Sequence, residues 1–145
     1  MKNIDVEIHS KPALTKTLVK TIVNEVSKIK NFHFSYLEIS FVTKEIIREI
    51  NKEHLNHDYP TDIITFEYDR DEDGKIDAEL LICSEIAEEN AEEFGVSVES
   101  ELLRLIVHGI LHLTGYDDTT DEKKKIMKSE EDHLVELLYP KLFII

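Results

Sequence analysis

Alternating and periodic apolar positions divide the chain into short strands and amphipathic helices. In "IDVEIH", residues 4–9, apolar and polar side chains alternate, which is typical of a strand with one buried face. Three further strands are predicted by segments rich in β-branched, aromatic and aliphatic residues: "YLEISFV" (36–42), "DIITFEY" (62–68) and "AELLIC" (78–83). The turn sequence "DRDEDG" (69–74) lies between the last two, so this pair is expected to form a hairpin.

Helical periodicity fills much of the remaining first half. Apolar side chains recur at helical spacing from Leu14 to Ile29, and Pro12 suits the first turn of that helix. Thr43 is expected to cap a short helix after the second strand. The polar segment 51–60 that follows predicts a loop.

Three more helices are predicted in the second half. Ser84 is expected to cap a helix that ends at Gly95. A helix beginning at Ser97 is apolar on nearly every side, which indicates a buried helix. Thr119 and Glu122 form a capping-box pattern for the last helix, which runs to about Leu138.

This mixture of strands and helices predicts an α/β (α+β) fold. We expect a single domain over residues 1–145, with a mixed sheet of about four strands, about five helices and a buried helix that carries the chemistry described below. No apolar run approaches the ~20 residues of a membrane span, and the N-terminal segment lacks the apolar stretch of a signal peptide. We therefore expect a cytoplasmic protein with no membrane partner.

Charge and cysteine content narrow the chemistry. The net charge of −14 argues against non-specific binding of nucleic acid, although a local basic patch such as "EKKKIMK" (122–128) can still contact phosphates. Cys83 is the only cysteine, so an internal disulfide and a four-cysteine zinc site are both excluded, and we expect it to be a small core residue. "DRDEDGKIDAEL" (69–80) imitates a calcium loop but has Leu80 where a glutamate is required, so an acidic hairpin turn is the better interpretation.

The stretch "HGILHLTGYDD", residues 108–118, has the spacing of a metal site. Four residues along a helix bring His108 and His112 to one face, ~6 Å apart along the axis, which suits two imidazoles that share one zinc ion. Asp118 would lie on the wrong face of a continued helix, but Gly115 can end the helix and let the chain return. We therefore expect one Zn²⁺ per chain, with His108, His112 and Asp118 as ligands. The alternative is a buried helix with two hydrogen-bonded histidines.

Zinc proteases share part of this pattern, but they carry a glutamate directly after the first histidine as the general base. Gly109 occupies that position here. Glycine has no group that accepts a proton from zinc-bound water, so a metallopeptidase is disfavoured.

The same stretch resembles the signature H-G-x-L-H-L-x-G-Y-D-H of the YbeY family. "DYPTDIITF" (58–66) is similar to the family's D-x-P-T-D-V-L-S-F, and "AELLICSEIAEENA" (78–91) to its G-D-I-x-I-S strand and following helix. Members are metal-dependent endoribonucleases of rRNA maturation. The resemblance therefore implies a zinc-dependent, single-strand-specific endoribonuclease of 16S rRNA 3′-end maturation and rRNA quality control. It also implies ribosomal RNA and the small ribosomal subunit as partners.

The resemblance carries the family's zinc histidines onto His108 and His112, but two positions depart from its pattern. Asp118 stands where the family has a third histidine. Aspartate is a competent zinc ligand, yet its negative charge makes the bound ion a weaker Lewis acid. Leu55 stands where the family has an arginine that faces RNA phosphate, and leucine cannot make that contact.

Five residues near that departure are expected to contact RNA. Lys52, His54 or His57 can replace the missing arginine, and the resemblance implies that Thr61 and Asp62 line the RNA groove. The alternatives are solvated loop histidines and an ordinary strand entry.

Two catalytic routes remain open from the residues. A zinc-bound hydroxide can attack phosphorus, or the metal can stabilise a pentacoordinate phosphate while the ribose 2′-OH attacks. The predicted catalytic group is His108 and His112 with Asp117 as proton acceptor, although Asp117 can equally cap the turn. A non-catalytic ribosome-assembly protein with a structural metal is the remaining alternative.

Overall fold

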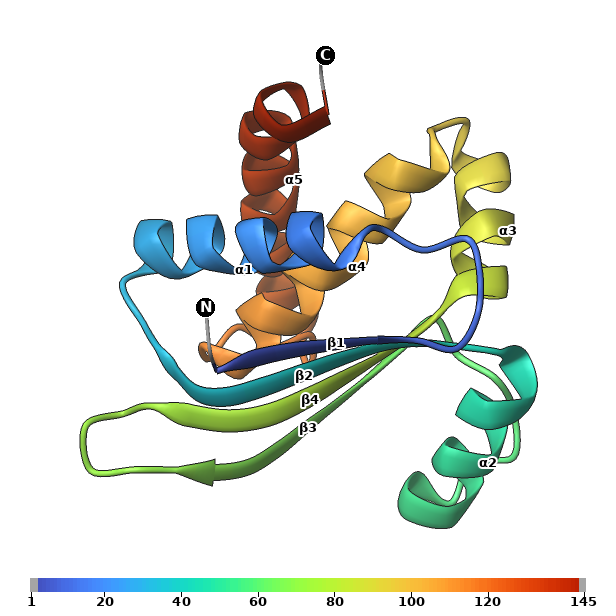
Figure 1. Ribbon diagram of the computed structural model, residues 1–145, viewed down its shortest axis with the longest axis horizontal. Coiled ribbons are helices and arrows are strands. Elements are labelled where there is room, and N and C mark those ends of the chain that lie inside the picture. Colours follow the sequence, from blue (N-terminus) through green and yellow to red (C-terminus); the bar gives the residue numbers. More distant parts are fainter. Residues whose placement is uncertain (1–2, 144–145) are drawn as a thin grey trace.

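Four strands form one mixed sheet in the order β1–β2–β4–β3 in the computed structural model, which describes residues 3–143 (Figure 1). The strands are β1 (Ile4–Ile8), β2 (Phe34–Val42), β3 (Ile63–Arg70) and β4 (Ile76–Cys83). β1, β2 and β4 are parallel, and β3 pairs antiparallel with β4. The predicted mixed sheet of about four strands is confirmed.

Helices cover both faces of this sheet unequally. The five helices are α1 (Lys16–Lys30), α2 (Lys44–Leu55), α3 (Ser84–Phe94), α4 (Val98–Leu113) and α5 (Asp121–Phe143). Figure 1 shows α1, α4 and α5 on one side of the sheet and α2 on the other. A small second core, which includes Ile47 and the buried Cys83, joins α2 to the sheet. None of the helices within residues 3–143 has the length and apolar content needed to cross a membrane.

Helix α4 is the buried centre of the molecule, as its sequence predicts. It contacts α1, α3, α5, β3 and β4, and most of its apolar side chains are fully buried. Gly109 lets its backbone approach the sheet. A Cβ atom at this position would lie 2.8 Å from Leu80 Cδ2 and 3.0 Å from Ile63 Cδ1. A larger side chain at position 109 would therefore have to displace the sheet's own side chains.

In the first half, the predicted Thr43 cap of α2 is confirmed, since its Oγ1 accepts from the Ile46 N–H at 3.2 Å. One helix start and one helix end differ from the prediction. Pro12 does not begin a helix, because α1 starts later, where the Thr15 hydroxyl accepts a hydrogen bond from the Leu18 N–H at 3.2 Å. The polar segment 51–60 is only partly a loop. Helix α2 continues through Leu55 and ends at Asn56, which adopts the left-handed conformation at φ 58°.

Two caps in the second half are also corrected. Ser84 does not cap α3; it is the first helical residue, and the Cys83 position before it offers no side-chain hydrogen bond. Thr120, rather than Thr119, caps α5, since its Oγ1 accepts from the Lys123 N–H at 3.1 Å. Thr119 does not cap the helix because its hydroxyl donates a hydrogen bond to Asp117 Oδ1 in the preceding turn. The helix also continues beyond the predicted end to Phe143.

The predicted hairpin between β3 and β4 is confirmed. Its turn is closed by the Asp71 carboxylate, which accepts the N–H groups of Asp73 and Lys75 at 2.9 Å each. Gly74 takes a positive φ of 80° there. The acidic side chains therefore belong to a β-turn flanked by strands, without the two helices of a calcium-binding loop.

Candidate functional site

Two cavities adjoin at His108. The larger, of about 780 Å³, is lined mainly by α3, α4 and α5, and the smaller, of about 270 Å³, by β3 and the segment after α2. Three residues line both cavities: Ile63, His108 and Asp118. We call the two cavities together the groove. The first histidine of the sequence motif thus lies at the centre of the groove.

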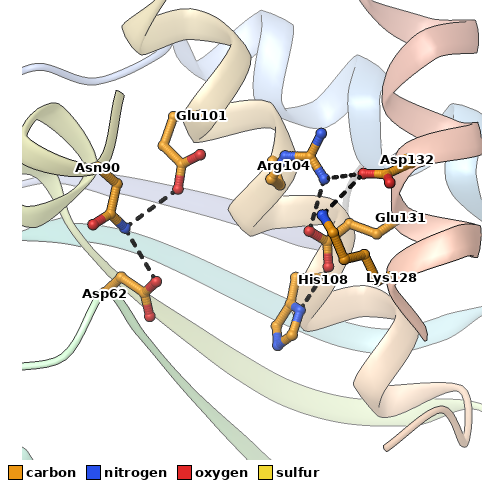
Figure 2. Close-up of polar contacts among 8 residues, drawn as sticks. All are labelled: Asp62, Asn90, Glu101, Arg104, His108, Lys128, Glu131 and Asp132. Carbon is orange, nitrogen blue, oxygen red and sulfur yellow. Dashed lines mark hydrogen bonds and ion pairs between the residues drawn. The ribbon is translucent and has the colours of Figure 1, made fainter. Parts of the chain in front are cut away.

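His108 is held from α5 by a residue that the sequence motif does not contain. Its Nδ1 lies 2.8 Å from Glu131 Oε2. Figure 2 shows this contact between α4 and α5. Glu131 is in turn held by Arg104, whose Nη1 donates to Glu131 Oε1 at 2.9 Å and to Asp132 Oδ1 at 2.7 Å. Arg104 lies one helical turn before His108 on α4, so α4 and α5 together fix the imidazole.

This hydrogen bond decides which imidazole nitrogen is free. It raises the pKa of His108 above its usual value. Burial opposes ionisation of Glu131, but the hydrogen bonds from His108 and Arg104 outweigh it and lower the Glu131 pKa. An ionised carboxylate only accepts, so Nδ1 carries the proton and Nε2 keeps its lone pair when the ring is neutral. Metal-binding histidines typically have this arrangement.

The other two predicted ligands, His112 and Asp118, both line the smaller cavity. His112 is exposed and lines the smaller cavity together with His108. Helix α4 ends at Leu113 with Thr114 as its C-cap, and Gly115 follows with a positive φ of 111°, which agrees with its predicted place at the end of the helix. Asp118 comes next, on the exposed turn. Across residues 3–143, however, no three histidine, cysteine, aspartate or glutamate side chains approach closely enough to hold a metal ion. The three-ligand zinc site therefore stays a prediction.

Asp117 is occupied within the turn. Its Oδ1 accepts the Thr119 N–H at 3.1 Å and the Thr119 hydroxyl at 2.8 Å. These hydrogen bonds lower the pKa of the Asp117 carboxyl. Asp117 is not among the residues lining the groove. Its contacts match the capping alternative, and its role as proton acceptor stays a prediction that these contacts do not support.

Of the five residues expected to contact RNA, three line the groove and two do not. His57 and Thr61 line the smaller cavity, and Asp62 lines the larger one. Lys52 and His54 are exposed on α2, outside the lining of both cavities. Leu55, which occupies the position of the family's arginine, lines the smaller cavity.

A polar chain in the larger cavity was missed by the sequence analysis. The Asn90 amide nitrogen donates to Asp62 Oδ2 at 3.3 Å and to Glu101 Oε2 at 3.4 Å (Figure 2). Glu101 is only 3% exposed, and burial raises its pKa. One signal was available: Glu101, Arg104 and His108 form a polar stripe at helical spacing on an otherwise apolar helix.

Cationic side chains of α4 and α5 line the larger cavity, together with the acidic Asp121 and Glu131 of α5. Residues with cationic side chains line the larger cavity: Arg104, Lys124, Lys125 and Lys128. The lining of the smaller cavity contains histidines but no lysine or arginine. The basic run predicted at residues 122–128 therefore borders the groove rather than a remote solvated face.

Comparison with known proteins agrees with this architecture. Residues 1–139 match the family model described as endoribonuclease YbeY. A protein of that name from Chlorobaculum tepidum is 40% identical over 124 residues, covering 86% of this chain and 89% of the relative. Another from Sulfurihydrogenibium is 38% identical over 138 residues, covering 93% and 90%. A solution structure of a Thermotoga maritima protein superposes with a TM-score of 0.64 at 28% identity, covering 95% of this chain and 90% of that chain.

Proposed function

The chain belongs to the endoribonuclease YbeY family, and on that premise we propose that it is a zinc-dependent endoribonuclease that cleaves single-stranded ribosomal RNA. One observation carries the proposal: the buried helix α4 presents His108 to a groove, with Nδ1 fixed by the ionised Glu131 and the lone pair of Nε2 left to bind a metal. In the cell, we propose 16S rRNA 3′-end maturation and rRNA quality control as its task. The small ribosomal subunit is the proposed partner, in the cytoplasm.

The donor set supports zinc. Two imidazoles and a carboxylate form a catalytic zinc set that leaves a coordination position open, and all three groups line the smaller cavity. His108 and His112 would bind from a rigid helix. Asp118 has to turn toward them, which its exposed place after Gly115 permits. When bound, the ion supplies a Lewis acid beside the scissile phosphate.

The side chains that line the groove support a single-stranded substrate. Each cavity has an exposed aromatic side chain in its lining, Phe94 (62% exposed) in the larger and Tyr59 (53% exposed) in the smaller. Unstacked bases bind aromatic faces, whereas paired bases in a duplex do not expose theirs. The lysines of α5 can contact the phosphates that link successive bases of the strand.

A peptidase is a poorer fit. Its general base would have to occupy position 109, where a glutamate would force the Leu80 and Ile63 side chains of the sheet to shift. The site therefore lacks the residue for that route, and the close packing disfavours it.

The test combines metal content with cleavage. Purified protein should contain roughly one zinc ion per chain by elemental analysis. It should cut labelled single-stranded RNA but not the duplex, and chelator should stop the cleavage. His108→Ala and His112→Ala should lose both metal and activity. Asp118→Ala should weaken zinc binding at least about tenfold, and Asp118→His should retain it.

His133→Ala is the matched control, because this exposed histidine of α5 is not among the groove residues. Its metal content and cleavage should equal those of the unmodified protein. Undiminished cleavage by the double variant of His108 and His112 would refute the proposed function.

A further inference from the structure

The larger cavity contains acceptor groups that the proposed metal site does not use. Asp62, Asn90 and Glu101 lie along one wall, brought together from the start of β3, from α3 and from α4. Glu101 is 97% buried, at 3% exposure, and its Oε1 has no hydrogen-bond partner within residues 3–143. A buried carboxylate oxygen costs free energy unless a donor reaches it, so this wall is suited to a ligand that brings N–H groups.

The hydrogen bonds of Asn90 determine how its amide group is oriented. Its amide N–H groups point at the two carboxylates, at 3.3 and 3.4 Å. The amide is thereby oriented with its carbonyl oxygen as a further acceptor. Asp62 and Glu101 keep additional acceptor capacity. The amide N–H groups of Asn90 are used within this cluster, so the wall offers a ligand mainly acceptor oxygens.

The rest of the cavity suits the other parts of a nucleotide. Phe94 stands in the lining with 62% of its surface exposed, which offers a face on which a base can stack. Lys124, Lys125 and Lys128 line the same cavity from α5 and can contact phosphate. At about 780 Å³, the cavity lies within the usual size range for ligand sites.

We propose that this cavity binds one guanine base of the RNA substrate, with the Asp62, Asn90 and Glu101 wall accepting hydrogen bonds from the base edge. The inference rests on the proposed endoribonuclease function and gives it a base-selective subsite beside His108. Guanine offers N1–H and N2–H₂ side by side, which is the donor-rich edge that carboxylates bind. Adenine and cytosine offer a single amino group there. Uracil offers one N–H between two carbonyl oxygens, which would face the wall's own acceptors.

The experiment measures binding without cleavage. Fluorescein-labelled hexauridylate, and the same oligonucleotide with one central G, A or C, are titrated with the full chain in chelator and followed by anisotropy. The G-containing oligonucleotide should bind at least about tenfold more tightly than hexauridylate, because a well-made pair of base contacts discriminates by this order. Glu101→Gln and Asp62→Asn should each remove most of this preference. Phe94→Ala should weaken all four oligonucleotides alike.

Glu99→Gln is the matched control, since it removes a charge from an exposed position on the same helix. It should keep the preference for guanine. Thermal unfolding checks that each variant folds. Glu101→Gln is expected to fold, because burial already raises the pKa of that carboxyl and a neutral amide is easier to bury.

The outcomes separate this inference from the proposed function. Equal affinities for the four oligonucleotides, or an unchanged preference in both Glu101→Gln and Asp62→Asn, would overturn the guanine subsite. Zinc-dependent cleavage without base preference would leave the nuclease and remove the subsite. A guanine preference without zinc-dependent cleavage would support the subsite and overturn the proposed catalytic activity.

Discussion

His108 depends on a carboxylate that lies 23 positions later in the chain. Because Glu131 is ionised and accepts from Nδ1, the ring presents Nε2 to the groove before any metal binds. Arg104 holds Glu131 in that position. The imidazole is thus oriented by a chain of contacts between two helices rather than by its own rotamer alone.

Glu131→Gln should therefore weaken zinc binding about ten- to a hundredfold, as is usual when the hydrogen-bond partner of a metal-binding histidine is changed. The amide is nearly isosteric but no longer a fixed, charged acceptor for Nδ1. Competition with a chromophoric chelator measures the affinity. Asp132→Asn is the control, because Asp132 contacts Arg104 without touching His108. Equal zinc affinities for the two variants would show that Glu131 does not position the ligand.

The sequence revealed only the local part of this arrangement. The spacing of His108, His112 and Gly115 is a property of one helix and its end, so it was readable without a structure. Glu131 and Asn90 come from other helices, and no pattern within the chain indicates which polar residue a helix packing will bring opposite another. Asp117 shows the converse: its motif suggested chemistry, but its contacts are those of a turn.

At the scale of elements, the end of α4 determines whether the third proposed ligand can return to the groove. Gly115→Val should cost roughly 1–2 kcal/mol of stability, because a β-branched residue resists a positive φ. No atom lies within 4 Å of a Cβ built there, so the cost is conformational rather than steric. The strained turn should also weaken zinc binding. Denaturant titration and zinc competition measure the two effects.

Gly74→Val provides the comparison, since Gly74 also has a positive φ and open space but lies in the β3–β4 turn and lines neither cavity. It should lose similar stability and keep its zinc affinity. Equal zinc affinities in both valine variants would show that the turn at position 115 does not position Asp118.

The type of an element was predictable where its apolar pattern was clear, as in α4 and the four strands. Element ends were not. Pro12 and Thr119 both have the chemistry of a helix start, but neither forms one. Thr15 lies nearer the first buried turn of α1, and the Thr119 hydroxyl already bonds Asp117. Such competition between neighbouring cap residues is decided by tertiary contacts.

Across the whole molecule, the net charge of −14 is unevenly distributed. Asp5, Glu38 and Glu79 lie in register across three strands. Burial and this row of acids raise the pKa of Glu38. The row alternates with Leu37 and Ile39, which belong to the main core, so it lies on the opposite face of the sheet. RNA should be repelled from that face and attracted to the lysines of α5.

A Lys124→Gln/Lys125→Gln double variant should reduce the dependence of RNA affinity on salt. Each lost contact with a single-stranded phosphate lowers the slope of log affinity against log salt by about 0.7, so we expect a change of about 1.4. Binding should weaken alike for all sequences, because phosphate contacts carry no base information. Anisotropy titrations at several salt concentrations measure the slope.

The control is a Lys11→Gln/Lys16→Gln double variant, which makes the same change in net charge at exposed positions away from the groove. Its salt slope should be unchanged. Equal slopes in the two double variants would show that only the overall charge matters.

The exposed turn after Gly115 also has a consequence for how such a protein can evolve. His108 and His112 are carried by the most buried helix, so replacing that helix's packing would endanger the fold. Position 118 lies on the surface, where exchanging one side chain for another disturbs no core contact. Mutation can therefore sample new donor groups at this one position while selection preserves the rest. Within the proposed zinc site, histidine and aspartate can therefore replace one another at this position without any repacking of the core.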